Sequence, residues 1–273
     1  MRNRILYLVV CAGSLARIDA AAIAVFDNSS YVNSSGGASA ASDSIQALLT
    51  LLGHTVTPFT GTSAGDFAAA ASTSDLILFP DLLNAGQLAL DLTPAAKAAL
   101  SNYVNSGGGL IAVGENAHRL LNVVFYPGCN FVTVHCFASS GTGSPSYLQP
   151  GGAAGTPFAS GPATLSSPPQ PTTALNLVAF SPPGVLNLYR DSVGGFPNST
   201  TVLMAPFGTG SYGYLAWDFA QAVPLGSLDG GWSNVLNTMV VEVAGVPEPS
   251  SMMLLGSGLA GLLCSRFRRS RNV

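Results

Sequence analysis

Short apolar runs alternate with helical patterns through the first half of the chain, and this alternation most constrains the fold. The strand-like runs cover residues 23–26, 55–57, 76–79 and 110–113. Helical patterns cover residues 44–52, 67–71 and 94–105, and the last begins at Thr93-Pro94 and stops at three glycines. Four strands separated by helices predict an α/β fold, with a parallel sheet covered by helices on both faces.

The second half of the chain has a different amino-acid composition. Residues 122–177 are rich in Gly, Pro, Ser and Thr, which predicts an irregular insertion. β-rich segments return at 186–190, 201–206 and 212–219. Residues 232–243 are predicted to form a closing helix rather than a strand, because apolar residues recur at helical spacing.

The N-terminus has the pattern of a secretory signal. Arg2 and Arg4 precede an apolar run at 5–16, and the alanines at 20–22 supply small residues where signal peptidase cuts. We therefore expect residues 1–21 to be a signal peptide. A lipoprotein signal ending at Cys11 is the alternative, but Val10 stands where that signal requires a smaller residue.

The C-terminus has three parts in a fixed order. Val246-Pro247-Glu248-Pro249 comes first, the apolar stretch 252–264 follows, and an arginine cluster at 266–271 ends the series. The prolines favour an extended peptide, the apolar stretch favours the bilayer as a transmembrane helix, and the arginines favour the cytoplasmic side. The stretch is short for a full span.

This order resembles the PEP-CTERM sorting tail over residues 246–271. The resemblance implies an exported protein whose tail anchors it transiently in the membrane and is processed at or near Pro247, Glu248 and Pro249 by an exosortase-type transpeptidase. Carriers of such tails often serve in exopolysaccharide or biofilm surfaces. An ordinary C-terminal membrane anchor is the alternative.

Charge excludes one class of partner. The formal net charge is −3, and four of the ten basic residues lie in the tail, so the middle of the chain is acidic. Nucleic-acid binding depends mainly on Lys and Arg neutralising phosphates. We therefore expect no nucleic-acid partner.

The central domain, residues 22–245, resembles the class I glutamine amidotransferase-like group, including its trehalose-utilisation-type members. The resembling pieces are Phe26-Asp27-Asn28 and the segments 53–56, 75–80 and 103–111. The resemblance implies a flavodoxin-like sheet. In catalytic members a nucleophilic Cys follows the fourth strand and a later His completes the triad.

Those catalytic residues are missing. Glu115 stands where the thiol would be, and the later strand offers Asp218 and no His. A carboxylate cannot form the thioester of glutaminase chemistry, so the resemblance implies the fold without that reaction. We lean towards a protein that is not an enzyme, with Glu115 and Asp218 as the candidates if catalysis occurs.

Polar residues follow the predicted strands. In open parallel sheets, ligands bind beyond the carboxyl ends of the strands. Such a cluster suits sugar hydroxyls or Ca²⁺, but no metal site is assigned, because Asp and Asn at strand ends are also common turn formers and helix caps. The candidate binding residues are Asp27, Asn28, Asp81, Glu115 and Asn116.

Cys129 and Cys136 are the cysteines left once both ends are removed. In an oxidising compartment a close pair most simply forms a disulfide. The alternative is a metal site with His118 and His135, although the usual metal-ligand spacing is missing.

The sequence thus favours an exported cell-surface or extracellular-matrix protein that binds a glycan, such as a polysaccharide, or another partner without catalysis. A surface glycan hydrolase using Glu115 with another strand-end carboxylate is one alternative. A purely structural matrix component is the other.

Overall fold

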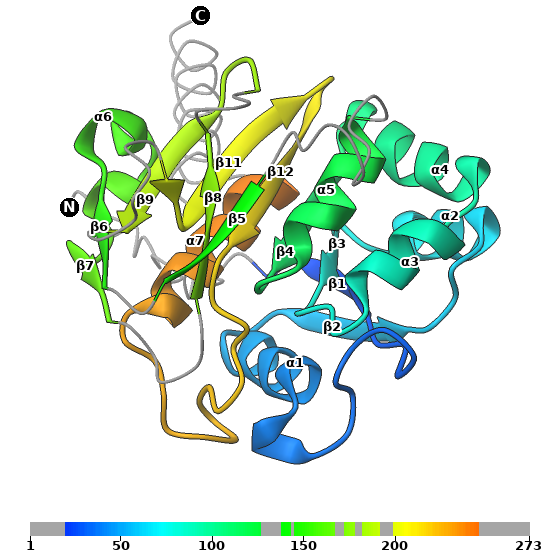
Figure 1. Cartoon of the computed structure of the whole chain (residues 1–273), viewed down its shortest axis with the longest axis horizontal. Coiled ribbons are helices and arrows are strands. Elements are labelled where there is room, and N and C mark those ends of the chain that lie inside the picture. Colours follow the sequence, from blue (N-terminus) through cyan, green and yellow to red (C-terminus); the bar gives the residue numbers. More distant parts are fainter. Residues whose placement is uncertain are drawn as a thin grey trace, which may run out of the picture. The chain divides into compact units, whose positions relative to one another are not determined.

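A nine-stranded sheet forms the centre of the computed structural model (Figure 1). Its parallel part has the order β2-β1-β3-β4-β12. The prediction of a parallel α/β sheet is confirmed, and its strands are β1 (Ala22–Phe26), β2 (Thr55–Phe59), β3 (Leu76–Phe79), β4 (Gly109–Val113) and β12 (Gly210–Leu215).

The structure describes residues 20–126, 138–142, 145–166, 172–177, 182–191 and 199–245. Residues 1–19 of the predicted signal peptide and residues 246–273 with the sorting tail lie outside these ranges. Within the described ranges, no helix is both long enough and apolar enough to cross a bilayer.

The sheet continues beyond β12 in antiparallel fashion. β11 and β12 form a hairpin, and Gly208 in its turn has a φ of 64°. Two strands of this extension come from the β-rich segments expected in the second half, β11 (Val202–Phe207) and β9 (Leu186–Asp191). The other two, β6 (Ser146–Leu148) and β7 (Thr164–Leu165), were not expected as strands.

The segment 122–177 contains more regular structure than a loop-rich composition suggests. Its described parts supply two strands of the main sheet's extension, a short helix and part of a separate three-stranded sheet. The additional elements are β5 (Ala138–Thr142), β8 (Thr172–Asn176), α6 (Pro150–Ala153) and η2 (Pro157–Ser160), and β10 (Ser199–Thr200) completes the small sheet.

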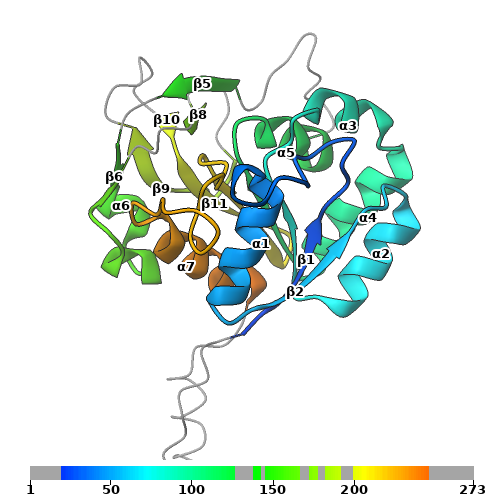
Figure 2. The ribbon, with the colours of Figure 1, turned by 90° about the horizontal axis from the view of Figure 1, so that it is seen from below.

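Helices cover both faces of the parallel strands, as expected (Figures 1 and 2). α1 (Ala41–Leu51) and α7 (Trp232–Ala244) lie on one face. α7 confirms the predicted closing helix and ends at Gly245, whose φ is 62°. The other face carries α2 (Ala64–Thr73), α4 (Pro94–Asn105) and α5 (Ala117–Phe125).

Neither α5 nor one further helix on this face was expected from the sequence. α3 (Ala85–Asp91) packs beside α5 on the second face. It has only seven residues, and its N-cap, Asn84, makes no side-chain capping hydrogen bond. Without a cap signal and with Gly86 in its first turn, this segment looks like a loop in the sequence.

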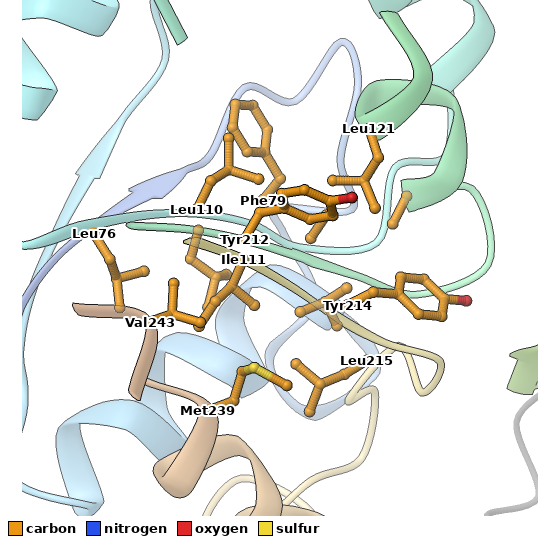
Figure 3. Close-up of a cluster of buried hydrophobic side chains, with 14 of the residues drawn as sticks. Leu76, Phe79, Leu110, Ile111, Leu121, Tyr212, Tyr214, Leu215, Met239 and Val243 are labelled. Carbon is orange, nitrogen blue, oxygen red and sulfur yellow. The ribbon is translucent and has the colours of Figure 1, made fainter. Parts of the chain in front are cut away.

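The alternation of β12 side chains determines which layer each residue joins. Tyr212 stacks on Phe125 of α5, with ring centroids 4.5 Å apart. A side chain on the neighbouring residue Gly213 would instead collide with Met239 of α7. Figure 3 shows this strand between the two apolar layers, with Met239 and Leu215 on the α7 side. The close approach of α7 explains the glycine at position 213.

Candidate functional site

Three carboxylates follow three neighbouring parallel strands. Asp81 comes after β3, Glu115 after β4 and Asp218 after β12, and these strands are adjacent in the sheet. Because the carboxyl ends of parallel strands meet at one edge, the fold brings the three residues to the same edge. We call Asp81, Glu115 and Asp218 the carboxylate edge.

A glycine turn determines how Asp81 meets β4. Gly114 has a φ of 86°, and its N–H donates to the carbonyl of Leu215 at 2.9 Å. A Cβ at this position would collide with the Asp81 carboxylate, so the carboxylate lies directly against the Gly114 backbone. Glycine is therefore needed both for the left-handed conformation and for the close approach.

The surroundings of Asp81 raise its pKa to about 6. Burial is the largest cause, and the negative charge of Asp218 adds to it. The backbone N–H groups of Asn116 and Glu115 oppose the shift, because they stabilise the ionised form. Asp81 Oδ1 is buried and has no hydrogen-bond partner among the described residues. Asp81 therefore carries a proton up to nearly neutral pH.

Asp218 has a raised pKa as well, with burial as the main cause. Its Oδ1 accepts a hydrogen bond of 3.0 Å from the N–H of Ala220. Tyr214 lies on β12 and is fully buried, and burial together with the charges of Asp81 and Glu115 raises the pKa of its phenol far above the usual value. Its hydroxyl therefore remains protonated beside the carboxylates.

Backbone strain accompanies Asp218. Phe219 and Gln221 have φ values of 63° and 61°, which side-chain-bearing residues rarely adopt. Phe219 is fully buried, and its ring centroid lies 4.5 Å from that of Trp217. The N–H of Gln221 donates to the carbonyl of Ala38 at 2.6 Å. Packing and hydrogen bonds thus hold a strained segment, an arrangement common at functional sites.

Asp27 and Asn28 have hydrogen-bond partners within the fold. The Ser42 hydroxyl donates to Asp27 Oδ1 at 2.7 Å. Asn28 Nδ2 donates to the Thr60 carbonyl at 2.7 Å, and Asn28 Oδ1 accepts from the N–H of Ser30 at 2.9 Å. Both ends of the Asn28 amide are therefore engaged in holding the β1–α1 loop. Asn28 thus fits the role of a turn former.

Asn116 contributes through its backbone. It precedes α5 but makes no side-chain capping hydrogen bond, while its N–H faces Asp81. Sequence reasoning missed Tyr214 and Gly114. The signal for Gly114 was its position between a strand and a helix, whereas nothing in the sequence pointed to Tyr214.

The described residues offer no metal centre. No group of three or more His, Cys, Asp or Glu side chains within the described ranges is arranged to hold a metal ion. The suggested Ca²⁺ therefore gains no support from this geometry. Cys129, Cys136 and His135, which were predicted to form a disulfide or part of a metal site, lie outside the described residues. His118 is buried, and its Nδ1 lies 3.1 Å from the Glu115 carbonyl oxygen.

The carboxylate edge thus offers hydrogen-bond acceptors and a carboxylic acid that ionises near pH 6. Carboxylate oxygens accept hydrogen bonds from hydroxyl groups, and a protonated carboxyl donates one. Glu115 occupies the strand-to-helix turn between β4 and α5.

A family model supports the reading of the tail. The model for the PEP-CTERM protein-sorting motif matches residues 245–269. The chain therefore carries this motif, as predicted. The motif implies an exported protein that is sorted through its C-terminal segment and processed by an exosortase.

Solved structures support the fold. The cytoplasmic protein STM1381 from Salmonella typhimurium LT2 is similar with a TM-score of 0.50 and 16% identity, over 80% of this chain and 98% of that chain. A ThuA-like protein from Bacteroides uniformis ATCC 8492 has a TM-score of 0.49 and 14% identity, over 81% of this chain and 90% of that chain.

A larger enzyme is also similar. The β-galactosidase from Bacillus circulans sp. alkalophilus has a TM-score of 0.49 and 12% identity, and the match spans 86% of this chain but only 32% of the enzyme. At such identities the likeness concerns the fold alone, and the STM1381 structure supports the predicted α/β fold with a mainly parallel sheet. No curated protein matches the chain in sequence.

Proposed function

We propose that this exported domain binds neutral, hydroxyl-rich glycans at its carboxylate edge. It would act at the cell surface or in the extracellular matrix, within an exopolysaccharide or biofilm layer. The observation that carries the proposal is Asp81, whose Oδ1 is buried without a partner beside a second perturbed carboxyl group, Asp218. Buried polar atoms are nearly always hydrogen-bonded, so an orphaned acceptor points to a ligand that donates.

Sugars supply the complementary chemistry. Each ring carries several hydroxyl donors, which suit a set of acceptors better than an acceptor-rich or anionic ligand does. The sorting motif supports a location at the cell surface, where such glycans occur.

Charge narrows the class of glycan further. Residues 22–245 contain eleven acidic and three basic side chains, a formal net charge of −8 with His neutral. Like charges repel, and the repulsion is strongest at low ionic strength. This charge therefore disfavours anionic glycans and supports the neutral glycans proposed above.

An array of neutral, cationic and anionic polysaccharides tests this proposal directly. Asp81→Asn and Asp218→Asn should each weaken retention of a neutral glycan about tenfold, the ~1.4 kcal/mol expected for losing one hydrogen bond to a charged group. Glu242→Gln on α7 makes the same charge change away from the carboxylate edge and should leave retention unchanged. Equal retention by all three variants would contradict the proposal.

Glycan hydrolysis is the second candidate function. A carboxyl group with a pKa near 6 is suited to general acid catalysis, and Asp81 has a pKa of about 6 beside Glu115 and Asp218. Release of reducing ends by the exported protein would support it, provided that Asp81→Asn and Glu115→Gln abolish the release while keeping glycan retention. If the folded variants change neither retention nor turnover, the domain is a structural matrix component.

A further inference from the structure

Ala21, just before β1, and Ala22, the first residue of β1, are tied into the fold through their backbones. The N–H of Ala21 donates to His54 Nδ1 at 3.2 Å, and its carbonyl accepts from the N–H of Thr55 at 3.0 Å. The N–H of Ala22 donates to Asp75 Oδ2 at 2.7 Å, and its carbonyl accepts from the N–H of Asp75 at 2.7 Å. Two consecutive residues thus satisfy all four of their backbone groups.

His54 is held in one tautomer by a residue of α7. Its Nε2 lies 3.0 Å from Oδ1 of Asn237 on α7, and that oxygen can only accept. Nε2 therefore carries the hydrogen and Nδ1 presents a lone pair to the Ala21 nitrogen. Burial lowers the pKa of His54, which keeps the ring neutral.

The residue before this pair is different. Ala20 is exposed, whereas the side chain of Ala21 is 0% exposed. Among the described residues, burial therefore begins at Ala21, one residue before the domain boundary expected from the sequence.

We propose that signal peptidase cleaves between Ala20 and Ala21, and that the new N-terminal ammonium of Ala21 is captured by His54 Nδ1 beside Asp75. Water supplies the hydroxyl group that completes the Ala20 carboxylate and the hydrogen that completes the Ala21 amine. The amine takes up a further proton near neutral pH. The proposal rests on export of the chain and is independent of the ligand at the carboxylate edge.

Cleavage at the neighbouring positions would remove hydrogen bonds that Ala21 and Ala22 make to the domain. Cleavage after Ala22 fits the small-residue rule at both recognition positions, but it removes every contact of Ala21 and Ala22 described above. Cleavage after Ala21 places the charged Asp19 at the outer recognition position and leaves His54 Nδ1 without its donor. Cleavage after Ala20 places Ile18 at the outer recognition position, which is uncharged but larger than the alanine that the rule favours. It keeps all of these hydrogen bonds and turns one of them into a charge-assisted bond, and this gain decides between the sites.

The test uses the full chain exported by a Gram-negative host. Amines of the native protein are labelled with an acetylating reagent and located by mass spectrometry. Lys97 is the chain's lysine, so its ε-amine is an internal standard for the N-terminal amine. We expect the exported chain to begin at Ala21, and a first residue at Ala22, Ile23 or any other position would overturn the proposal.

Reactivity tests the capture itself. In the native protein the α-amine should be labelled at least several-fold more slowly, relative to Lys97, than in urea. His54→Leu removes the acceptor and should restore the ratio found in urea. Asn237→Leu keeps the imidazole ring but no longer fixes its tautomer, so it should give an intermediate ratio. This variant keeps the test possible if His54→Leu is not exported in folded form.

An unchanged ratio in both variants would overturn the capture even with Ala21 as the first residue. Glycan retention is measured on the same wild-type sample. A failure to retain glycans would therefore not affect the N-terminal result. A first residue other than Ala21 would likewise not affect the glycan-binding result.

Discussion

At the carboxylate edge, the backbone conformation of Gly114 affects the electrostatic surroundings of Asp81. Gly114 adopts a left-handed conformation that lets the Asp81 carboxylate pack on the backbone of the turn. The same contact places Asp81 against the N–H groups of residues 115 and 116. The backbone geometry of one glycine and the protonation of one carboxyl group are therefore linked.

Replacing that glycine should be costly. Gly114→Ala forces a side chain into a φ of 86° and into the Asp81 carboxylate, so we expect a loss of about 2–4 kcal/mol in unfolding free energy. Gly37→Ala is the matched control, because Gly37 has a φ of 57° with nothing near its Cβ. It should cost only about 1 kcal/mol. Urea titration measures both, and equal losses would contradict the close contact.

The raised pKa of Asp81 predicts a pH dependence with a definite sign. The folded protein holds this proton up to about pH 6, whereas the unfolded chain releases it near 3.8. Between these values the folded state binds more protons, so the contribution of Asp81 to stability falls as pH rises, by about 2–3 kcal/mol. Asp218 acts in the same direction.

Comparison with Asp81→Asn isolates this contribution from that of other carboxylates. Unfolding free energies measured by urea titration from pH 4 to 7 should fall more steeply for wild type than for the variant. Parallel pH profiles would show that Asp81 has an ordinary pKa.

Among the elements, the segment after β12 holds Asp218 in place through packing. Phe219 is buried against Trp217 and Trp232, and its backbone is strained. Gln221 joins this segment to the loop that follows β1. The aromatic contacts therefore compensate for a conformation that the chain would otherwise avoid.

Truncating the buried ring tests this role. Phe219→Ala should lower the unfolding free energy by about 3–5 kcal/mol, because it empties a packed aromatic site. Leu225→Ala is the control in the same segment, since Leu225 is 46% exposed, and it should change stability by less than about 0.5 kcal/mol. Thermal unfolding ranks the two, and a small effect of Phe219→Ala would contradict the role assigned to packing.

Across the whole domain, the ends of the fold and the carboxylate edge lie at opposite ends of the parallel strands. Ala22 contacts Asp75 just before β3, and a Cβ on Gly109 at the start of β4 would collide with Val243 near the end of α7. Gly245, where the sorting motif begins, follows α7 directly. The three carboxylates follow the other ends of the strands.

Removal of the tail should therefore leave glycan retention unchanged. The exported chain with its tail and the processed form should bind a neutral glycan with equal affinity, within about twofold, because no residue of the carboxylate edge lies near Gly245. Surface-immobilised glycan binding measures both forms. A clear difference in affinity would place the ligand elsewhere on the molecule.

The sequence by itself determined the strands, helices and motifs that are specified by residues close together in the chain. Apolar runs gave β1, β3 and β4 because a strand buried on both faces needs continuous apolar residues. Thr93-Pro94 gave the start of α4, and the Thr93 side chain indeed accepts from the N–H of Ala96. The order of the tail motif likewise depends only on the residues themselves. α3 was not predicted because it lacks such a local signal.

Only the tertiary structure decided how distant residues combine. Asp81, Glu115 and Asp218 could each be located after a strand, but their mutual effect on pKa depends on burial and on strand order. Tyr214 gave no sequence signal, because its role arises from neighbours on other strands. His54 likewise gave no sequence signal for its role, because it contacts Ala21, 33 positions away, and Asn237, 183 positions away. Local signals specify helices and strands, whereas burial and charge act through space, and the fold alone determines those distances.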